Sequence, residues 1–261
     1  MARGSELDAR GKVALVVGGA SGMGRLAAQR WADAGGVAVA ADIDEVGLKE
    51  TAGGRESLHA RRVDITDPEA VFQLVDEVER EFGPLERVYN GAAIQPTGMI
   101  LDQDLDEIHR VMAVNYGGLV NVTKAVLPRL VSRGRGSLIN FASIAGWVPN
   151  MHFGAYSASK FAVVGFTECL YHENRGKGVH ICCVCPAQVD TPLRAQATSK
   201  PRIMEVGPKP MPPAFVLDAI DRAVAKRVFW VFPGLTTRMG WWLRRFVPWV
   251  MWKIDHNAEG F

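Results

Sequence analysis

The stretch that decides the fold lies near the N-terminus and reads Lys12-Val-Ala-Leu-Val-Val-Gly18-Gly-Ala-Ser-Gly22-Met-Gly24. Its apolar half, Val13–Val17, predicts a buried β-strand, and the residues from about Gly22 to Gly35 predict a helix that follows at once. Glycines permit the tight turn between them and let the backbone approach a pyrophosphate, which the free N–H groups of the helix N-terminus stabilise. Although G-x-x-x-G-x-G could be a plain turn, its strand-to-helix setting favours nucleotide binding. The expected cofactor contacts are Gly18, Ser21, Gly22, Met23 and Gly24.

The same alternation of apolar strands and helix-period segments continues along the chain. Further strands are predicted at Val37–Ala41, Leu58–Val63, Leu85–Tyr89, Ser137–Ala142, Val179–Val184 and Arg227–Phe232. Further helices are predicted after Asp44, after Asp67-Pro68, over Leu105–Leu130 and over Ala155–Arg175. This order predicts an α/β fold, a Rossmann-like doubly wound parallel sheet with helices on both faces. We expect a single domain over residues 1–261, in which residues 191–213 form a mobile substrate-loop segment.

Length and composition exclude several classes of protein. A chain of 261 residues with 48% hydrophobic and 22% charged residues is neither a disordered polymer nor a disulfide-stapled miniprotein. The N-terminus lacks the apolar core of a signal peptide. Cys182 and Cys185 have a C-x-x-C spacing, but they fall in a predicted strand, and no second pair completes a site. We therefore predict reduced, buried thiols, no metal site, no nucleic-acid partner and a cytoplasmic protein.

Asp42 ends the second predicted strand, eighteen residues after Gly24. An acid at this distance from the glycine turn accepts hydrogen bonds from the adenosine ribose and repels a 2′-phosphate. The residue between the last two glycines, Met23, is not basic, although Arg25 lies nearby. The pattern thus favours NAD over NADP, the alternative for Asp42 being a helix cap.

Tyr156 and Lys160 are four residues apart in a predicted helix, so they share a face. A lysine ammonium there favours the phenolate and is expected to lower the tyrosine pKa from its usual value near 10. An exposed Tyr and Lys would be the ordinary alternative. Ser143 lies at the end of the fifth strand, thirteen residues before Tyr156, and Asn115 interrupts an apolar helix. Strand ends of this kind are where ligands bind in doubly wound folds.

These motifs resemble the short-chain dehydrogenase/reductase family of the Tyr-x-x-x-Lys type, along roughly residues 11–232. The resemblance implies that Tyr156 exchanges the proton with the substrate oxygen, and that Ser143 hydrogen-bonds that oxygen. It implies that Lys160 binds the nicotinamide ribose, and that Asn115 holds Lys160 through a water relay.

The resemblance also implies cofactor contacts beyond the glycine turn. It places Asp64 and the adjoining Ile65 against the adenine, Asn90 beside the cofactor, Val189 at the carboxamide and Thr191 at a phosphate. It further implies a homodimer or homotetramer through the two long helices. Three positions depart from the family pattern: Val17, the turn Tyr89–Ala92, and Ala187.

The C-terminal extension, residues 235–261, is basic and holds four of the seven tryptophans of the chain. From Arg222 to Ile254 there are seven basic residues and no Asp or Glu, while the remainder carries a net charge of −5. The longest uncharged run near its centre, Phe246–Trp252, is too short to span a bilayer. Residues 235–254 could lie in a membrane interface as an amphipathic helix, cover the substrate pocket or form a subunit interface. The basic residues of this extension could also bind an acyl carrier.

The expected function is hydride transfer between NAD(H) and an apolar secondary alcohol or ketone, because the loops after the fourth, fifth and sixth strands are mostly apolar. A lipid, steroid or terpenoid skeleton would suit such walls. Two alternatives stay open: a reductase of an acyl thioester or other carbonyl, and a nucleotide-binding scaffold protein without turnover.

Overall fold

A computed structural model describes residues 7–199 and 201–260 of the chain. Its centre is a sheet of seven parallel strands in the order β3-β2-β1-β4-β5-β6-β7. The chain reverses direction across the sheet between β1 and β4, as in a Rossmann-like doubly wound fold. The strands are β1 (Val13–Val17), β2 (Val37–Asp42), β3 (Leu58–Arg62), β4 (Leu85–Asn90), β5 (Ser137–Phe141), β6 (His180–Val184) and β7 (Trp230–Val231).

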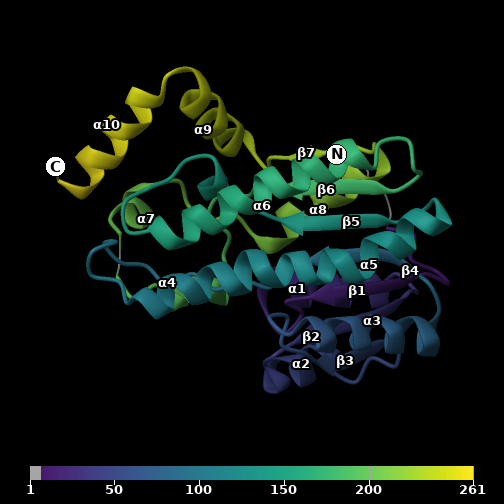
Figure 1. Cartoon of the computed structure of the whole chain (residues 1–261). Helices are drawn as coiled ribbons and strands as arrows, with labels where there is room; N and C mark the ends of the chain where they lie inside the picture. Colours follow the sequence, from purple (N-terminus) through teal and green to yellow (C-terminus); the bar gives the residue numbers. More distant parts are fainter. Residues whose placement is uncertain (1–6, 200, 261) are drawn as a thin grey trace.

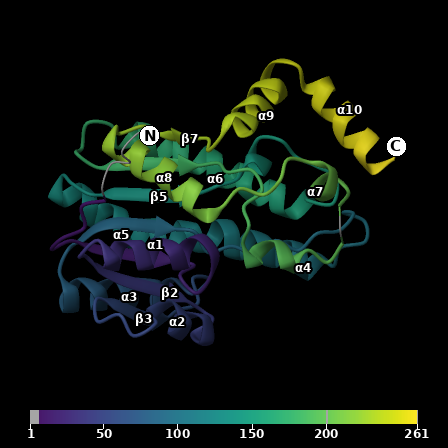
Figure 2. The same cartoon turned by 180° about the vertical axis from the view of Figure 1, so that it is seen from behind.

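Helices cover both faces of this sheet (Figures 1 and 2). The first half of the chain supplies α1 (Gly22–Asp33), α2 (Glu45–Ala52), α3 (Pro68–Phe82), α4 (Leu105–Met112) and α5 (Leu119–Arg133). The second half supplies α6 (Gly154–Glu173), α7 (Ile203–Val206), α8 (Pro213–Ala225), α9 (Leu235–Phe246) and α10 (Pro248–Glu259). Short helical turns are η1 (Ala113–Gly118), η2 (Ile144–Gly146) and η3 (Pro192–Gln196).

The five residues of β1 are all buried, and their side chains alternate between two cores. Val13, Leu15 and Val17 face a core shared with α3, α5 and α6. Ala14 and Val16 face a second core shared with α1 and α8. Because successive residues of a strand point to opposite faces, an unbroken apolar run requires this cover on both sides. Because β1 is buried on both faces, the sheet lies between two layers of helices. A ligand can then reach the sheet only at the ends of its strands.

Three elements differ from the sequence-based prediction. The helix expected over Leu105–Leu130 is interrupted by a π-helical turn, Ala113–Gly118, that separates α4 from α5. The last strand is only the dipeptide Trp230–Val231, and Arg227, at the start of the predicted strand, has a positive φ of 52°, which is outside the β region. Helix α8 was not predicted, although it buries Val216, Leu217 and Ile220 against the sheet.

The segment 191–213 and the C-terminal extension both contain helices. The first includes η3 and α7 and hydrogen-bonds to the loop after β4, for example from the Thr97 hydroxyl to the Ser199 carbonyl at 2.7 Å; its mobility stays a prediction. The extension consists of two helices, α9 and α10, which meet at Val247 because Pro248 starts a new helix. In the described part of the chain, no helix is both long and apolar enough to cross a membrane.

The thiols of Cys182, Cys183 and Cys185 are free and buried in β6 and just after it. Burial raises the pKa of the Cys182 and Cys183 thiols, because a thiolate would lose its hydration there. A raised pKa leaves little thiolate for redox or metal chemistry. These cysteines therefore act as small apolar side chains of the core.

A buried ion pair links β4 to α8. Arg87 donates to Asp221 at 2.7 Å, and its guanidinium lies 4.9 Å from the centre of the Trp31 ring. Removing one partner of a buried pair leaves an uncompensated charge.

We expect Asp221→Asn to lower the free energy of unfolding by about 3 kcal/mol, as measured by urea denaturation. The exposed pair between Arg30 and Asp218 provides the control: Asp218→Asn should cost less than about 1 kcal/mol. If both variants lost the same free energy of unfolding, the Arg87–Asp221 pair would not have the stabilising role given to it here.

Candidate active site

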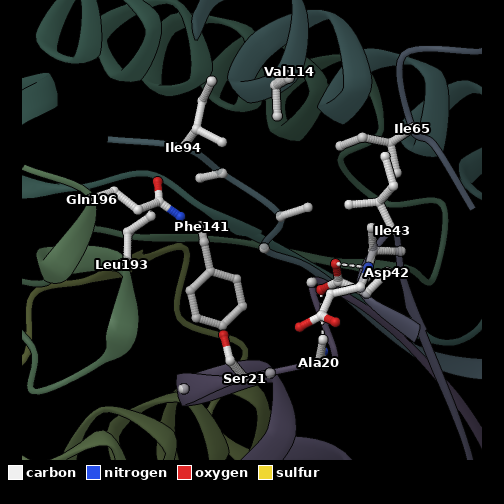
Figure 3. Close-up of a pocket in the computed structure, with 18 of the residues that line it drawn as sticks. Ala20, Ser21, Asp42, Ile43, Ile65, Ile94, Val114, Phe141, Leu193 and Gln196 are labelled. Carbon is white, nitrogen blue, oxygen red and sulfur yellow. Dashed lines mark hydrogen bonds between the residues drawn. The ribbon is translucent and has the colours of Figure 1, made fainter. Parts of the chain in front are cut away.

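A cavity of about 690 Å³ lies at the carboxyl ends of β1, β2 and β4. In Figure 3, Ala20 and Ser21 lie on one side of it, and Ile94 and Val114 on the other. Asp42 and Ile65 lie at the end opposite Leu193 and Gln196 (Figure 3). The cavity therefore carries a carboxylate on the side opposite Leu193 and Gln196, and its size is that of a cofactor site.

The turn between β1 and α1 forms the floor of this cavity. A Cβ added at Gly24 would lie 2.0 Å from the Gly18 carbonyl oxygen, so only glycine permits this approach of helix to strand. Gly18 and Gly22 have positive φ values of 84° and 51°. Ser21 precedes α1 but its side chain makes no capping hydrogen bond, and the first turn of α1 has no acidic residue. The helix N-terminus therefore presents free N–H groups suited to an anion.

Asp42 is oriented by two backbone N–H groups. Its carboxylate accepts from Ala20 at 3.1 Å and from Asp44 at 3.2 Å. Asp44, in contrast, caps α2 by accepting from the N–H groups of residues 46 and 47. Arg25, the nearby base, pairs with Glu50 at 2.8 Å and donates to the Ala20 carbonyl. The carboxylate at the cavity end is thus fixed, and the closest guanidinium is already engaged.

The other residues that the resemblance implies as cofactor contacts do not all line the same cavity. Asp64, Ile65 and Thr191 line the 690 Å³ cavity. Hydrogen bonds from Thr66 lower the pKa of Asp64 below its usual value, because they favour the carboxylate. Val189 lines a second, neighbouring cavity. Asn90 is different: its buried amide donates to the Leu119 carbonyl at 3.0 Å and to the Asn140 side chain at 3.3 Å.

The expectation that Asn90 lies beside the cofactor stays a prediction, and the structure gives the orientation of its side chain. Its neighbours Tyr89 and Gly91 line the cavity, whereas the Asn90 side chain points into the layer between β4 and α5. Side chains alternate along a strand, which gives Asn90 the core side. Asn90 is therefore a residue that ties β4 to α5 and to β5.

The second cavity, about 820 Å³, contains the residues expected to carry the chemistry. Ser143, Tyr156 and Lys160 line it, and it shares Met23, Gly91 and Phe141 with the first cavity. The two cavities therefore meet beside the Tyr156–Lys160 pair. Most other lining residues are apolar, and α9 and α10 supply part of the wall. From these two helices come Thr236, Thr237, Gly240, Met251, Ile254, Asn257 and Ala258.

Tyr156 and Lys160 share a face of α6 and are both buried. The Lys160 Nζ lies 5.6 Å from the centre of the Tyr156 ring and donates to the Phe141 carbonyl at 2.9 Å. Burial raises the pKa of Tyr156 to about 12, which its hydrogen bond with Ser143 partly opposes. Burial also lowers the pKa of Lys160 to about 8.

The expectation that the pKa of Tyr156 lies below its usual value is therefore wrong, because burial raises it. The loss of hydration disfavours the charged form of each group, and for Tyr156 it outweighs the hydrogen bond with Ser143. At neutral pH Tyr156 is therefore protonated and Lys160 is mostly charged. Before the reaction, the exchangeable proton is therefore on the Tyr156 hydroxyl.

Asn115 lies in the π-helical turn between α4 and α5 and is completely buried. Its Oδ1 accepts from the Ile94 N–H at 2.8 Å, and its Nδ2 donates to the Ile94 carbonyl at 2.9 Å and to the Ser159 hydroxyl at 3.0 Å. Ser159 in turn donates to the Tyr156 carbonyl at 2.7 Å. Asn115 therefore joins the loop after β4 to the turn of α6 that carries Tyr156 and Lys160, and its water relay to Lys160 stays a prediction.

Sequence reasoning left one feature of the site open and missed another. That residues 235–254 cover the substrate cavity was one of several alternatives, because the sequence shows amphipathic helices but not what they cover. The role of Ser159 was missed entirely, although its place one residue before Lys160 puts it on the face of α6 toward Asn115. A buried-type polar residue in an apolar helix was the available signal.

Comparison with known proteins agrees with this geometry. Residues 12–202 match the short chain dehydrogenase family. A relative, the 1-deoxy-11-beta-hydroxypentalenate dehydrogenase of Streptomyces exfoliatus, is 37% identical over 199 residues, 73% of this chain and 72% of its own. The chain therefore belongs to the short-chain dehydrogenase/reductase family, and it is an oxidoreductase that acts on CH–OH groups.

Two solved structures extend the likeness to nearly the whole chain. A short chain dehydrogenase/reductase from Burkholderia phymatum in complex with NAD has a TM-score of 0.84 and 26% identity, covering 94% of this chain and 96% of its own. A short-chain dehydrogenase from Sphingobium yanoikuyae in complex with NADPH has a TM-score of 0.78 and 25% identity, covering 93% and 95%. Proteins of this fold thus bind either nicotinamide cofactor.

The lowered pKa of Lys160 makes a prediction about stability. Between about pH 8 and the unfolded value of 10.5, the unfolded chain binds more protons than the folded one, so the stability of the wild type rises with pH across this window. At pH 7 the buried charge costs about 3 kcal/mol. We expect Lys160→Met to raise the free energy of unfolding at pH 7, and the gain to shrink between pH 8 and 10.5, as measured by urea denaturation.

Lys124, exposed on α5, provides the matched control, because Lys124→Met should leave stability nearly unchanged at every pH. A Lys160→Met protein that is less stable than the wild type at pH 7, or whose difference from it does not vary with pH, would contradict this account.

Proposed function

We propose that this chain catalyses reversible hydride transfer between NAD(H) and an apolar secondary alcohol or ketone, with Tyr156 as the acid–base group. The observation that carries the proposal is the junction of the two cavities beside the buried Tyr156–Lys160 pair. In net terms the alcohol loses a hydride and a proton to become a ketone. NAD, when bound, accepts that hydride, and NADH returns it.

The residues of the chain handle the proton. In the direction of reduction, Tyr156 begins protonated, because its raised pKa keeps the proton on the phenol at neutral pH, and it gives this proton to the carbonyl oxygen as negative charge develops there. Ser143 donates a hydrogen bond to the same oxygen and stabilises the charge that develops there. Lys160, charged and close to the phenol ring, stabilises the phenolate that remains. Asn115 is a positioning residue, acting through Ser159 and the backbone of Ile94.

The glycine turn, Asp64, Ile65 and Thr191 would bind the cofactor, with Asp42 on the adenosine ribose. NAD is preferred to NADP in this proposal for two reasons. The fixed Asp42 carboxylate can accept from both ribose hydroxyls and repels a 2′-phosphate. Arg25 cannot easily neutralise that phosphate, since it is paired with Glu50 and the Ala20 carbonyl.

The substrate cavity supports an apolar skeleton of considerable size, such as a lipid, steroid or terpenoid. Its volume of about 820 Å³ and its apolar walls, including Phe153, Met204 and Met251, favour such a molecule. The named activity of the Streptomyces relative, on a hydroxypentalenate, is compatible with this class.

We also propose assembly as a homodimer or homotetramer through α4–α5 and α6. Leu105 on α4 and Phe161 on α6 are exposed apolar side chains on these helices, and an interface would cover them. The cytoplasmic location stays a prediction from the sequence.

Replacement of the acid–base group tests the chemistry. We expect Tyr156→Phe to lower kcat for NAD reduction with an alcohol panel by about 10²–10⁴-fold, because the proton no longer has a positioned carrier. Binding of NAD, measured by calorimetry, should be retained. Tyr171→Phe on the same helix is the control and should leave kcat unchanged. Equal rates for the wild type and Tyr156→Phe would reject the proposal.

Replacement of the cavity-end carboxylate tests the cofactor preference. We expect Asp42→Ala to lower kcat/KM for NAD and to raise it for NADP, shifting their ratio by about tenfold or more toward NADP. Asp33→Ala, which removes an exposed carboxylate paired with Arg55, is the matched control. An unchanged ratio in Asp42→Ala would remove Asp42 from the ribose site.

A further inference from the structure

Helices α9 and α10, here called the arm, lie outside the layers of the fold, beyond α6 and α7 (Figures 1 and 2). The inner face of the arm closes the substrate cavity with residues such as Gly240, Met251 and Ile254. Asp255 fastens α10 to the body by accepting from the Met151 N–H at 3.0 Å. The arm is thus attached to the body along its inner face.

The outer face of the arm carries large exposed apolar side chains, here called the aromatic stripe. Within each helix they follow one another at intervals of three or four residues, so four of them share one side of α9 and two share one side of α10. The stripe consists of Leu235, Met239, Trp242, Phe246, Trp249 and Trp252. Each is more than half exposed, with Trp249 at 63% and Phe246 at 59%. So much contiguous exposed apolar surface marks an interaction site.

An open apolar groove of about 630 Å³ adjoins the stripe. Trp230 and Phe232 from the end of β7 form one side, and Met239, Trp241 and Trp242 of α9 form the other. The Trp241 Nε1 is buried and has no hydrogen-bond partner. The outer surface therefore offers both exposed apolar side chains and an open apolar groove.

The arm is positively charged, which favours an anionic partner. Arg238, Arg245 and Lys253 are exposed beside the stripe, and no acidic residue occurs between Leu235 and Ile254. The acidic residues of α10 come at its end, where Asp255 contacts Met151. The rest of the chain outside residues 222–254 has a net charge of −5, so the positive charge is local to this surface.

We propose that the arm docks on an anionic phospholipid surface, with the aromatic stripe in the boundary between headgroups and acyl chains and the basic residues on lipid phosphates. Tryptophans favour that boundary because the ring is apolar and its N–H remains wet. A second copy of this chain fits less well, since a two-fold contact of the stripe with itself would bring like charges together. The arm lies on the bilayer and does not cross it.

Docking in this way has a consequence for catalysis, which rests on the function proposed above. The same two helices face lipid on one side and the substrate cavity on the other. An apolar alcohol dissolved in the membrane would therefore reach the cavity along the arm without passing through bulk water.

The proposal is tested by co-sedimentation of the full chain with vesicles of phosphatidylcholine alone or mixed with phosphatidylglycerol. We expect binding to the anionic vesicles, weakened by salt, and little binding to the neutral ones. Arg238→Gln with Arg245→Gln should weaken binding about 30-fold, since each basic residue contributes about 1 kcal/mol at such a surface. Trp249→Ser with Trp252→Ser should weaken it by about tenfold or more. Brominated phospholipid should quench the wild-type tryptophan fluorescence.

Two control variants show whether vesicle binding depends on the arm itself. Phe72→Ser removes an exposed aromatic side chain on α3 and should bind vesicles like the wild type. Tyr156→Phe should also bind like the wild type, so failure of the proposed catalysis would not affect this test. The docking proposal is overturned if the wild type ignores anionic vesicles, or if the tryptophan variant binds as tightly as the wild type. It is equally overturned if that variant only dissociates an oligomer in sedimentation velocity.

Discussion

The positive charge of Lys160 lies inside the protein, where water cannot hydrate it, and its ammonium donates to the Phe141 carbonyl at the end of β5. Much of the surrounding structure serves to hold that charge beside the Tyr156 phenol. Helix α6 presents both side chains, β5 supplies the carbonyl, and the Asn115–Ser159 contact fixes the turn of α6 between them. Burial of this kind is costly for a charged group, as the lowered pKa of the lysine and the raised pKa of the tyrosine indicate.

The sequence predicted the features that depend on local spacing. The glycine turn was predicted because glycines in a strand-to-helix setting permit a tight turn, and the structure shows that the approach of residue 24 to the Gly18 carbonyl excludes a side chain at position 24. The face of α6 was predicted because residues four apart coincide on a helix. The π-helical turn that contains Asn115 was not predicted. One additional residue in a helical turn does not visibly change the spacing of the apolar residues. The sign of the Tyr156 pKa shift was also wrong, since it depends on how much water the completed fold removes. The inward orientation of Asn90 likewise emerges only with the register of β4 against β5.

The arrangement of the two cavities connects the fold to the proposed reaction. The first lies over the ends of the strands where the chain reverses direction in the sheet, and the second lies between β5, α6 and the arm. Phe141 and Gly91 belong to both walls, and a side chain at position 91 would meet the Phe141 ring at 3.1 Å. The glycine in this turn, where the family pattern is altered, therefore lets the backbone pack closely against the Phe141 ring at the junction. The arm completes the second cavity and gives it an apolar outer surface at the same time.

The most direct measurement of the central claim is a crystal structure of the protein with NAD. The account predicts that the adenosine ribose hydroxyls lie on the Asp42 carboxylate and that the nicotinamide ring lies at the junction of the two cavities, facing the Tyr156 hydroxyl. A cofactor bound elsewhere, or a nicotinamide ring held away from Tyr156 with Lys160 still on the Phe141 carbonyl alone, would contradict it.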